Sequence, residues 1–265
     1  MHSPHTRRRL PQCLIIGVRK AGSRALLNFL NLHSKIQTAR REVHFFDHDN
    51  NYSQGYDWYR QQMPYTFKDQ ITIEKSPSYF VVKGVPERVY QMNSTIRLLL
   101  IVREPVARAV SDYLQIRDVR LNRGKIMEPF ETLAIDNETG EINRSYNAIK
   151  RSVYHRHLQK WLLFFDLDQI HIIDGDNLVK RPWEEMYMAE EFLGLEHEIK
   201  EENFVFNSTR GFFCTVLNSQ QQHCLSQGKG RPHPAIDKNV LRKLKDFFRP
   251  LNEKFFHLVG QSFNW

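Results

Sequence analysis

Residues 13–30 read CLIIGVRKAGSRALLNFL, and this stretch decides the fold. An apolar strand runs into a loop that contains Gly17 and Gly22, and apolar residues at helical spacing follow the loop. The backbone N–H groups of such a loop bind an anion together with the positive end of the helix dipole. Lys20 and Arg24 add full positive charges. The stretch therefore predicts an anion-binding strand–loop–helix unit.

The loop is close to the pattern GxxxxGK[ST] of nucleotide-triphosphate loops but departs from it at the lysine. Ser23 directly follows Gly22, and Lys20 lies inside the loop instead. A P-loop kinase or NTPase remains an alternative, with residues 170–174 (IHIID) as its magnesium-binding strand. A glycine turn with solvated basic residues is the simpler alternative.

Strands alternate with helices along the rest of the chain. Strands are expected over residues 71–74, 96–102 and 169–173, and helices over 86–92, 105–119, 146–165, 183–193, 237–248 and 252–259. Irregular β structure is expected over 204–224. This alternation predicts an α/β fold with a central parallel sheet flanked by helices. We expect a disordered basic leader over residues 1–10 and a single domain over 11–265.

Composition narrows the functional class. The 265 residues carry 38 Lys+Arg against 30 Asp+Glu, for a net charge of +8, and 12% are aromatic. The aromatic content excludes a mainly disordered chain. No apolar run approaches the roughly 18 residues that a membrane-spanning helix needs. The basic surplus predicts a polyanionic or phosphorylated partner, so a non-catalytic polyanion-binding module is a second alternative.

Cysteines and asparagines carry further signals. Cys13 lies in an apolar run and is expected to be a buried free thiol, while Cys214 and Cys224 are spaced for a hairpin disulfide. No CxxC pair supports a zinc site, and no metal is expected. N-x-[ST] sequons are found at Asn51, Asn93, Asn137, Asn143 and Asn207. They favour a secretory chain, but residues 1–9 are polar and basic, so any anchor would lie outside this chain.

Residues 101–105 (IVREP) form a second strand end with a basic residue. Arg103 closes the strand, a helix opens at Pro105, and Ser111 lies about two turns into it. Ligands of open α/β sheets bind at the carboxyl ends of the strands, so Arg103 is expected to face the same crevice as the first loop. An ion pair with Glu104 is the alternative. Two anion sites suit a nucleotide phosphorylated at both ends.

With residues 42–47 (EVHFFD), 74–80 (EKSPSYF) and 229–234 (KGRPHP), the chain resembles the heparan sulfate glucosamine 3-O-sulfotransferases, most closely their isoform-five type. The resemblance runs over residues 11–265. It implies a P-loop-like sulfotransferase fold. It also implies transfer of a sulfuryl group from 3′-phosphoadenosine 5′-phosphosulfate (PAPS) to the 3-hydroxyl of glucosamine in heparan sulfate, leaving PAP and requiring no metal.

Partners and location follow from the same resemblance. The expected partner is heparan sulfate or heparin rather than nucleic acid. The expected location is the Golgi lumen, as the catalytic domain of a type II membrane protein whose anchor lies outside this chain.

The resemblance gives roles to four residues near the reacting atoms. Glu42 is the general base, although the residues alone would favour a surface ion pair with the arginines before it. Lys20 stabilises the departing phosphate, Lys75 is a second cleft lysine, and His44 orients Glu42 or contacts the sugar.

The remaining roles are also implied by the family. Donor binding falls to Lys20, Ala21, Gly22, Ser23, Arg24, Arg103, Ser111, Phe213, Lys229, Gly230, Arg231, Pro232 and His233. Acceptor binding falls to Glu42, Val43, His44, Phe45, Phe46, Asp47, His48, Lys75, Ser76, Pro77, Ser78, Gln115, Lys160, Trp161 and Leu162. Phe213 would pack on the adenine, beside the family's disulfide hairpin at Cys214 and Cys224. By helical spacing alone, Trp161 would be a core residue.

Overall fold

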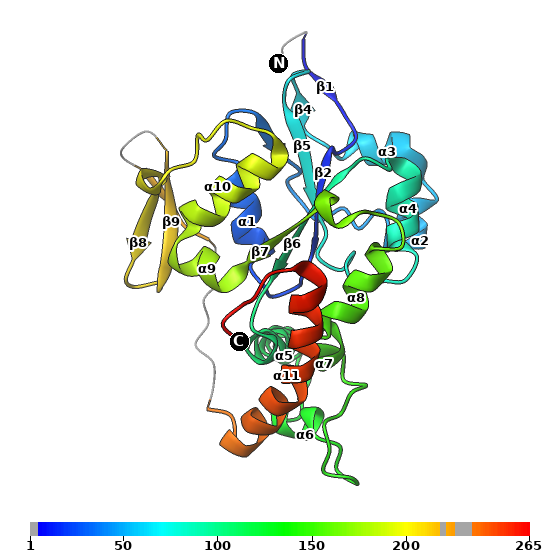
Figure 1. Ribbon diagram of the computed structural model, residues 1–265, viewed down its shortest axis with the longest axis vertical. Helices are drawn as coiled ribbons and strands as arrows, with labels where there is room; N and C mark the ends of the chain where they lie inside the picture. The colour runs from blue at the N-terminus through cyan, green and yellow to red at the C-terminus, as the bar shows by residue number, and fades with distance from the viewer. Residues whose placement is uncertain (1–4, 218–220, 226–234) are drawn as a thin grey trace. The chain divides into compact units, whose positions relative to one another are not determined.

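The structure is a computed structural model that describes residues 5–217, 221–225 and 235–265. The chain forms two compact units (Figure 1). The first consists of Met1–Val102 and Trp161–Gly230, and the second of Arg103–Lys160 and Arg231–Trp265. That both units act as one catalytic domain stays a prediction.

A five-stranded parallel sheet forms the centre of the first unit. Its order is β3 (Ile36–Thr38), β5 (Ile71–Lys75), β2 (Cys13–Gly17), β6 (Arg97–Val102) and β7 (Ile170–Asp174). All five residues of β2 are buried, as expected for a strand that is covered on both faces. The predicted parallel α/β fold is therefore confirmed. β3 was missed because three residues are too few to show a strand period.

Helices cover both faces of this sheet. Figure 1 shows α1 (Ser23–Leu30) and α10 (Pro182–Leu193) on one side and α4 (Val85–Met92) on the other. Gly194 follows the end of α10 in the left-handed conformation that glycine favours at helix ends. The unit also holds α2 (Asp49–Tyr52), α3 (Gly55–Gln61) and α9 (Gly175–Lys180).

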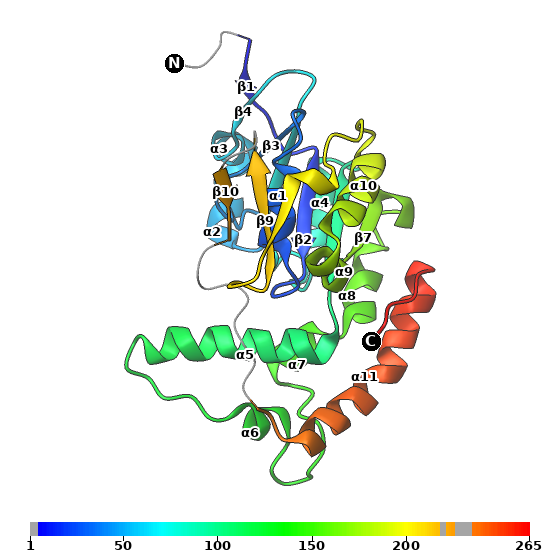
Figure 2. The same ribbon diagram turned by 90° about the vertical axis from the view of Figure 1, so that its left-hand side faces the viewer.

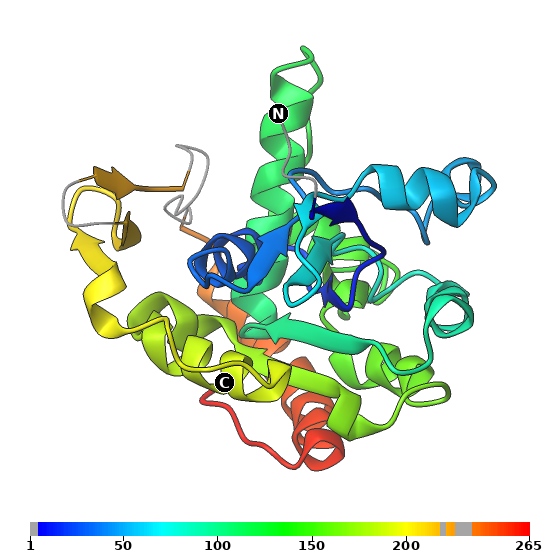
Figure 3. The same cartoon turned by 90° about the horizontal axis from the view of Figure 1, so that it is seen from above.

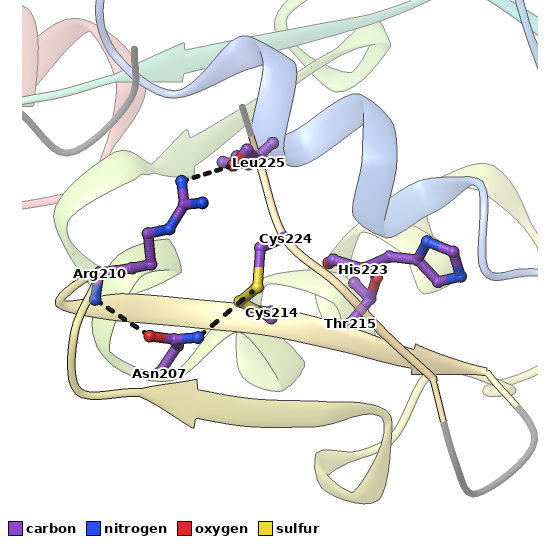
Figure 4. The surroundings of a disulfide bond; sticks show 7 residues. All are labelled: Asn207, Arg210, Cys214, Thr215, His223, Cys224 and Leu225. Atoms are coloured by element: carbon purple, nitrogen blue, oxygen red, sulfur yellow. Dashed lines mark hydrogen bonds between the residues drawn. A yellow bond between two sulfur atoms is a disulfide. The ribbon is translucent and has the colours of Figure 1, made fainter. Parts of the chain in front are cut away.

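A small antiparallel sheet lies to one side of the five-stranded sheet (Figure 3). It consists of β8 (Phe204–Asn207), β9 (Phe212–Leu217) and β10 (Gln221–His223). A disulfide joins Cys214 to Cys224 across it, which confirms the predicted pair (Figure 4). Cys13 is a buried free cysteine, also as predicted.

The second unit is helical. It contains α5 (Pro105–Leu121), α6 (Phe130–Ala134), α7 (Asn147–Arg151), α11 (Lys238–Val259) and most of α8 (Tyr154–Trp161). Figure 2 shows α5 as a long helix with α7 beside it. Its core includes Val110, Tyr113, Ile149, Leu244 and Phe248.

Two helix predictions in this unit were wrong. Residues 146–165 form α7 and α8 rather than one helix. The chain breaks at Ser152, whose buried hydroxyl donates to Pro105 O at 3.0 Å and accepts from Arg108 Nε at 2.7 Å. Residues 238–259 form one helix where two were expected, and Pro250 lies inside it. Burial of Phe248 and Phe255 on either side outweighs the helix-breaking tendency of proline.

The basic leader is partly ordered. Arg7–Arg8 (β1) pairs antiparallel with Tyr65–Thr66 (β4), and the Arg8 guanidinium lies 4.7 Å from the Tyr65 ring centroid. The disorder predicted for residues 1–10 therefore does not extend to these two arginines. Within the described residues, no helix is both long and apolar enough to cross a membrane.

Candidate active site

Steric constraints shape the loop between β2 and α1. A Cβ on Gly17 would lie 2.6 Å from Phe80 Cβ, and Gly22 opens α1 with a left-handed φ of 119°. Val18 N donates to Ile101 O at 2.7 Å, which ties the loop to the end of β6. Glycine permits the close approach at Gly17 and the positive φ at Gly22. The loop therefore carries backbone N–H groups and Lys20 at the carboxyl end of β2.

Three cationic side chains surround the carboxylate of Glu42. The Lys75 ammonium donates to Glu42 Oε1, the Arg24 guanidinium lies 3.7 Å from the same oxygen, and His44 Nε2 lies 3.5 Å from Oε2. Arg24 comes from α1, Lys75 from the end of β5, and His44 from the segment that holds Glu42. We call these four residues the Glu42 cluster. This cluster links α1, the helix that follows the loop over residues 17–22, to Glu42, the predicted base.

Burial and charge together set the ionisation of this cluster. Burial raises the pKa of Glu42, but hydrogen bonds from His44 and Lys75 outweigh it and lower the pKa to about 2. Hydrogen bonds to Asp47 and then to Glu42 raise the pKa of His44 to about 10. Burial lowers the pKa of Lys75. At neutral pH, Glu42 is therefore a carboxylate and His44 an imidazolium.

Asp47 orients the imidazolium from its other ring nitrogen. His44 Nδ1 lies 2.9 Å from Asp47 Oδ2, which also accepts from Ser78 Oγ at 2.5 Å. Only 3% of the Asp47 side chain is exposed, yet its pKa is lowered because the hydrogen bonds from His44 and Ser78 outweigh burial. The chain Ser78–Asp47–His44–Glu42 thus holds His44 against the carboxylate.

Comparisons with known proteins identify what this geometry belongs to. The sulfotransferase domain family matches residues 10–260. The heparan sulfate glucosamine 3-O-sulfotransferase 5 of Homo sapiens is 49% identical over 256 residues, which cover 97% of this chain and 74% of that protein. The chain belongs to the heparan sulfate glucosamine 3-O-sulfotransferases. The 3-O-sulfotransferase 3B1 of Mus musculus is 43% identical over 261 residues, covering 97% of this chain and 65% of that protein.

A solved structure shows the same fold. The crystal structure of a sulfotransferase from Alicyclobacillus acidocaldarius superposes with a TM-score of 0.71 at 18% identity, covering 96% of this chain and 98% of that one. Membership of the family confirms the prediction of an enzyme and excludes both alternatives, the P-loop kinase and the non-catalytic module. Consistently, the Asp174 carboxylate caps α9 by accepting from Asp176 N at 2.8 Å and Asn177 N at 3.2 Å.

In this 3-O-sulfotransferase, a second carboxylate that the sequence analysis missed lies behind the Glu42 cluster. Glu74 is fully buried and accepts from Val43 N at 3.2 Å, Tyr59 Oη at 3.1 Å and Ser76 Oγ at 2.7 Å. Burial raises its pKa despite these bonds. A glutamate in the middle of a buried strand is the signal that could have revealed it. Glu74 anchors the residue that directly follows Glu42.

Several predicted acceptor residues are buried in the core. Buried side chains include those of Val43, Phe45, Phe46, Ser76, Pro77 and Trp161. Phe45 stacks on Tyr59 with ring centroids 4.2 Å apart, and Trp161 Nε1 donates to Phe80 O at 3.2 Å. These side chains are largely enclosed by the protein, and a saccharide contact by any of them stays a prediction. Ser78 and Leu162 remain half-buried and His48 is exposed, whereas the Asp47 side chain is almost wholly enclosed.

Three more predicted residues lie at the start of the second unit. Arg103, Ser111 and Gln115 are half-buried. Tyr154 Oη donates to Arg103 O at 2.7 Å, and the Glu104 carboxylate caps α5 by accepting from the backbone N–H groups of its first turn. Donor binding by Arg103 and Ser111, and acceptor binding by Gln115, stay predictions.

Lys160 lines a cavity of about 470 Å³ in the second unit. Arg144, Lys150 and Arg156 line it as well, and Ile149, Val153 and Phe247 supply apolar walls. This basic lining suits an anionic group.

Phe213 lies beside the disulfide. Its ring meets Trp183 edge-on with centroids 5.6 Å apart, and Phe206 at 5.3 Å. Trp183 is an aromatic neighbour that sequence reasoning did not connect with it. The predicted donor residues Lys229, Gly230, Arg231, Pro232 and His233 lie outside the described residues.

One group in the described part of the chain has ligand atoms close enough for a metal ion. It consists of His44, Asp47 and His48, whose atoms lie within 4.8 Å of one another. Both ring nitrogens of His44 already face carboxylates, at 2.9 Å and 3.5 Å. We therefore assign this group to the hydrogen-bond chain described above.

Proposed function

We propose that this sulfotransferase moves a sulfuryl group from PAPS to the 3-hydroxyl of a glucosamine residue in heparan sulfate. Its 49%-identical relatives are heparan sulfate glucosamine 3-O-sulfotransferases, which supports this substrate and position. The observation that carries the mechanism is the Glu42 cluster, where a carboxylate meets cations from α1 and β5.

The reaction is an in-line displacement at sulfur. The sugar oxygen forms a new S–O bond, the S–O bond to the donor phosphate breaks, and the bonding electrons leave with PAP. The hydroxyl proton passes to Glu42, which the surrounding cations keep ionised at neutral pH. The loop over residues 17–23, with Lys20, and the predicted Arg103 and Ser111 would hold the two phosphate ends.

Lys75 couples the two halves of this reaction. In the free protein it pairs with Glu42, and a carboxylate with a pKa of about 2 is a weak proton acceptor. If Lys75 turns to the donor as negative charge develops on the leaving phosphate, Glu42 loses the pairing that lowers its pKa. The base then strengthens as the leaving group is stabilised.

The remaining predictions fit an enzyme of polyanionic polysaccharides. The cavity beside Lys160 offers further basic side chains to sulfate groups. We propose heparan sulfate as the partner. We expect no nucleic-acid partner and no required metal. The disulfide Cys214–Cys224 is compatible with the oxidising Golgi lumen.

Glu42→Gln tests the mechanism. We expect kcat to fall about 100- to 10,000-fold, as for loss of a general base, because the amide cannot take the hydroxyl proton. Labelled sulfate transfer to heparan sulfate measures the rate, and PAP binding by calorimetry serves as the control that should not change. Wild-type turnover in this variant would contradict the mechanism. Disaccharide analysis that finds sulfate only on other hydroxyls would contradict the substrate assignment.

A chelator tests the absence of a required metal. We expect transfer to persist in EDTA at the rate measured without it, because lysine, arginine and imidazolium supply the positive charge. Complete loss, restored by adding a divalent cation, would contradict this proposal.

A further inference from the structure

Asn51 lies in α2 and faces the segment that carries Glu42. Its side-chain amide is half-buried, and Nδ2 donates to both Val43 O and His44 O at 3.0 Å. These are the carbonyls of the two residues directly after Glu42. Both amide hydrogens of Asn51 are therefore used.

The N–H groups of the same segment are held from elsewhere. Val43 N donates to Glu74 Oε1 at 3.2 Å, His44 N to Ser76 Oγ at 3.0 Å, and Phe45 N to Tyr79 Oη at 2.9 Å. The β5 end and the turn after it thus fix the donors, while Asn51 fixes two acceptors. The segment is clamped from both sides.

This clamp acts on an unfavourable backbone conformation. His44 has a φ of 53°, in the left-handed region that non-glycine residues seldom adopt. Such a conformation costs of the order of 1–3 kcal/mol and persists only where neighbouring groups hold it. The conformation aims the His44 ring between Asp47 and Glu42. Loss of the Asn51 bonds would leave the carbonyls on both sides of this residue without their donor, and only the N–H groups of the same peptides would still be held.

We propose that Asn51 is a positioning residue for Glu42 and His44, and that its sequon carries no glycan. Only the kinetic consequence of this inference rests on the proposed function. An N-glycan replaces one Nδ2 hydrogen with a bond to the sugar, which leaves a single donor for two carbonyls.

The other sequons differ in this respect. Asn143 Nδ2 donates to Leu133 O at 3.1 Å, and Asn207 Nδ2 contacts Cys224 Sγ at 3.8 Å, so each uses one donor. Asn137 is exposed, and Asn93 accepts from Thr95 through its oxygen alone. Within the described part of the chain, neither the Asn93 nor the Asn137 amide nitrogen donates a hydrogen bond. Asn93 and Asn137 are thus the sequons whose amides can carry a glycan without losing a bond.

The neighbouring serine provides a matched control. Ser53→Ala destroys the sequon but keeps the Asn51 amide, whereas Asn51→Asp destroys the sequon and replaces the donor with an oxygen that repels both carbonyls. Ser53 is exposed, and its hydroxyl reaches only Asn50 O, at 3.1 Å. We expect wild-type kcat for Ser53→Ala. We expect a kcat lowered about 10- to 100-fold for Asn51→Asp, as for a misplaced reacting group, with unchanged PAP affinity.

Equal losses in both variants, or an unchanged kcat in Asn51→Asp, would overturn the positioning role. Should Asn51→Asp fail to fold, Asn51→Gln keeps the amide one methylene further out, and we expect an intermediate kcat from it. Two readouts do not depend on the reaction. Glycopeptide mass spectrometry of the wild-type chain from a secretory host should find Asn51 unmodified, and occupancy there would overturn the inference. NMR of the His44 imidazole should change in Asn51→Asp and not in Ser53→Ala.

Discussion

Two clusters of charged side chains, one from each unit of the chain, differ in their access to solvent. In the second unit, Arg108 and Asp112 pair at 3.2 Å, Arg151 joins Asp112 at 3.0 Å, and both Arg108 and Asp112 are fully buried. In the first unit, the Glu42 and Arg24 side chains are each 33% exposed. We call the group in the second unit, which consists of Arg108, Asp112 and Arg151, the Asp112 cluster.

The difference in burial corresponds to a difference in role. The Arg108 guanidinium also donates to Ser152 Oγ and Ala148 O, so the Asp112 cluster fastens α5 to the turn after α7. Arg151 is 29% exposed, but no ligand can replace the partner of Arg108 or Asp112, because both of these side chains are buried away from solvent. In the Glu42 cluster, Lys75 and His44 can exchange one anion for another because the carboxylate is partly open. The same residue types therefore support structure in one unit and chemistry in the other.

Asp112→Ala should produce the largest change in stability. It leaves the Arg108 charge buried without its carboxylate, which costs about 3–5 kcal/mol. Urea denaturation measures the loss. The matched control is Asp246→Ala, which removes an exposed pair with Arg249 at 2.7 Å and should change stability by less than about 0.5 kcal/mol. Similar losses in the two variants would mean that the Asp112 cluster is not sealed.

Asp47→Asn should have an intermediate effect. It removes the main group that raises the pKa of His44, so this pKa should fall from about 10 toward 6.5. A raised pKa stabilises the folded state at pH below 6.5, and that stabilisation is lost as pH rises through 10. The variant should therefore lose about 1.5–3 kcal/mol at pH 7, as for a hydrogen bond to a charged group.

Imidazole NMR measures this change directly. Wild-type His44 should remain protonated from pH 6 to pH 8, while His44 in Asp47→Asn should titrate within or near that range. An unaltered titration in the variant would show that Asp47 does not control the imidazolium. Asp49→Asn, which alters an exposed carboxylate paired with Arg88, is the control.

Arg24→Ala should have the smallest effect on stability. Its guanidinium is 3.7 Å from Glu42 and partly exposed, so the free energy of unfolding should fall by less than about 1 kcal/mol. The KM for donor or acceptor should rise instead, since Glu42 keeps Lys75 and His44. A loss of stability as large as that of Asp112→Ala, with KM unchanged, would erase the distinction between the two clusters.

Much of the fold was predictable because its signals are local. The strand Cys13–Gly17 and the start of α1 at Ser23 agree with prediction, since an apolar run and a glycine turn mark them directly. The break at Ser152 and the helix through Pro250 were mispredicted. In each, burial against distant residues overrode a local preference.

The same difference between local signals and contacts with distant residues applies to the candidate site. Glu42, His44 and Lys75 could be chosen from the sequence through the family resemblance, and the structure brings them together. The hydrogen-bond partners of Glu74 and Asn51 could not be predicted in this way, because they are backbone groups of other segments. Phe45 and Trp161 were assigned to the acceptor although both are buried.

By itself, the sequence determined the first strand–loop–helix unit, the parallel α/β class, the family and the disulfide partners, because residue type and spacing encode each of them. Only the tertiary structure decided which charged side chains are buried and which reach solvent. It also decided which asparagine amides are occupied, and which of the residues near Glu42 face solvent. Burial and hydrogen-bond partners depend on segments far apart in the chain, and no local pattern records them.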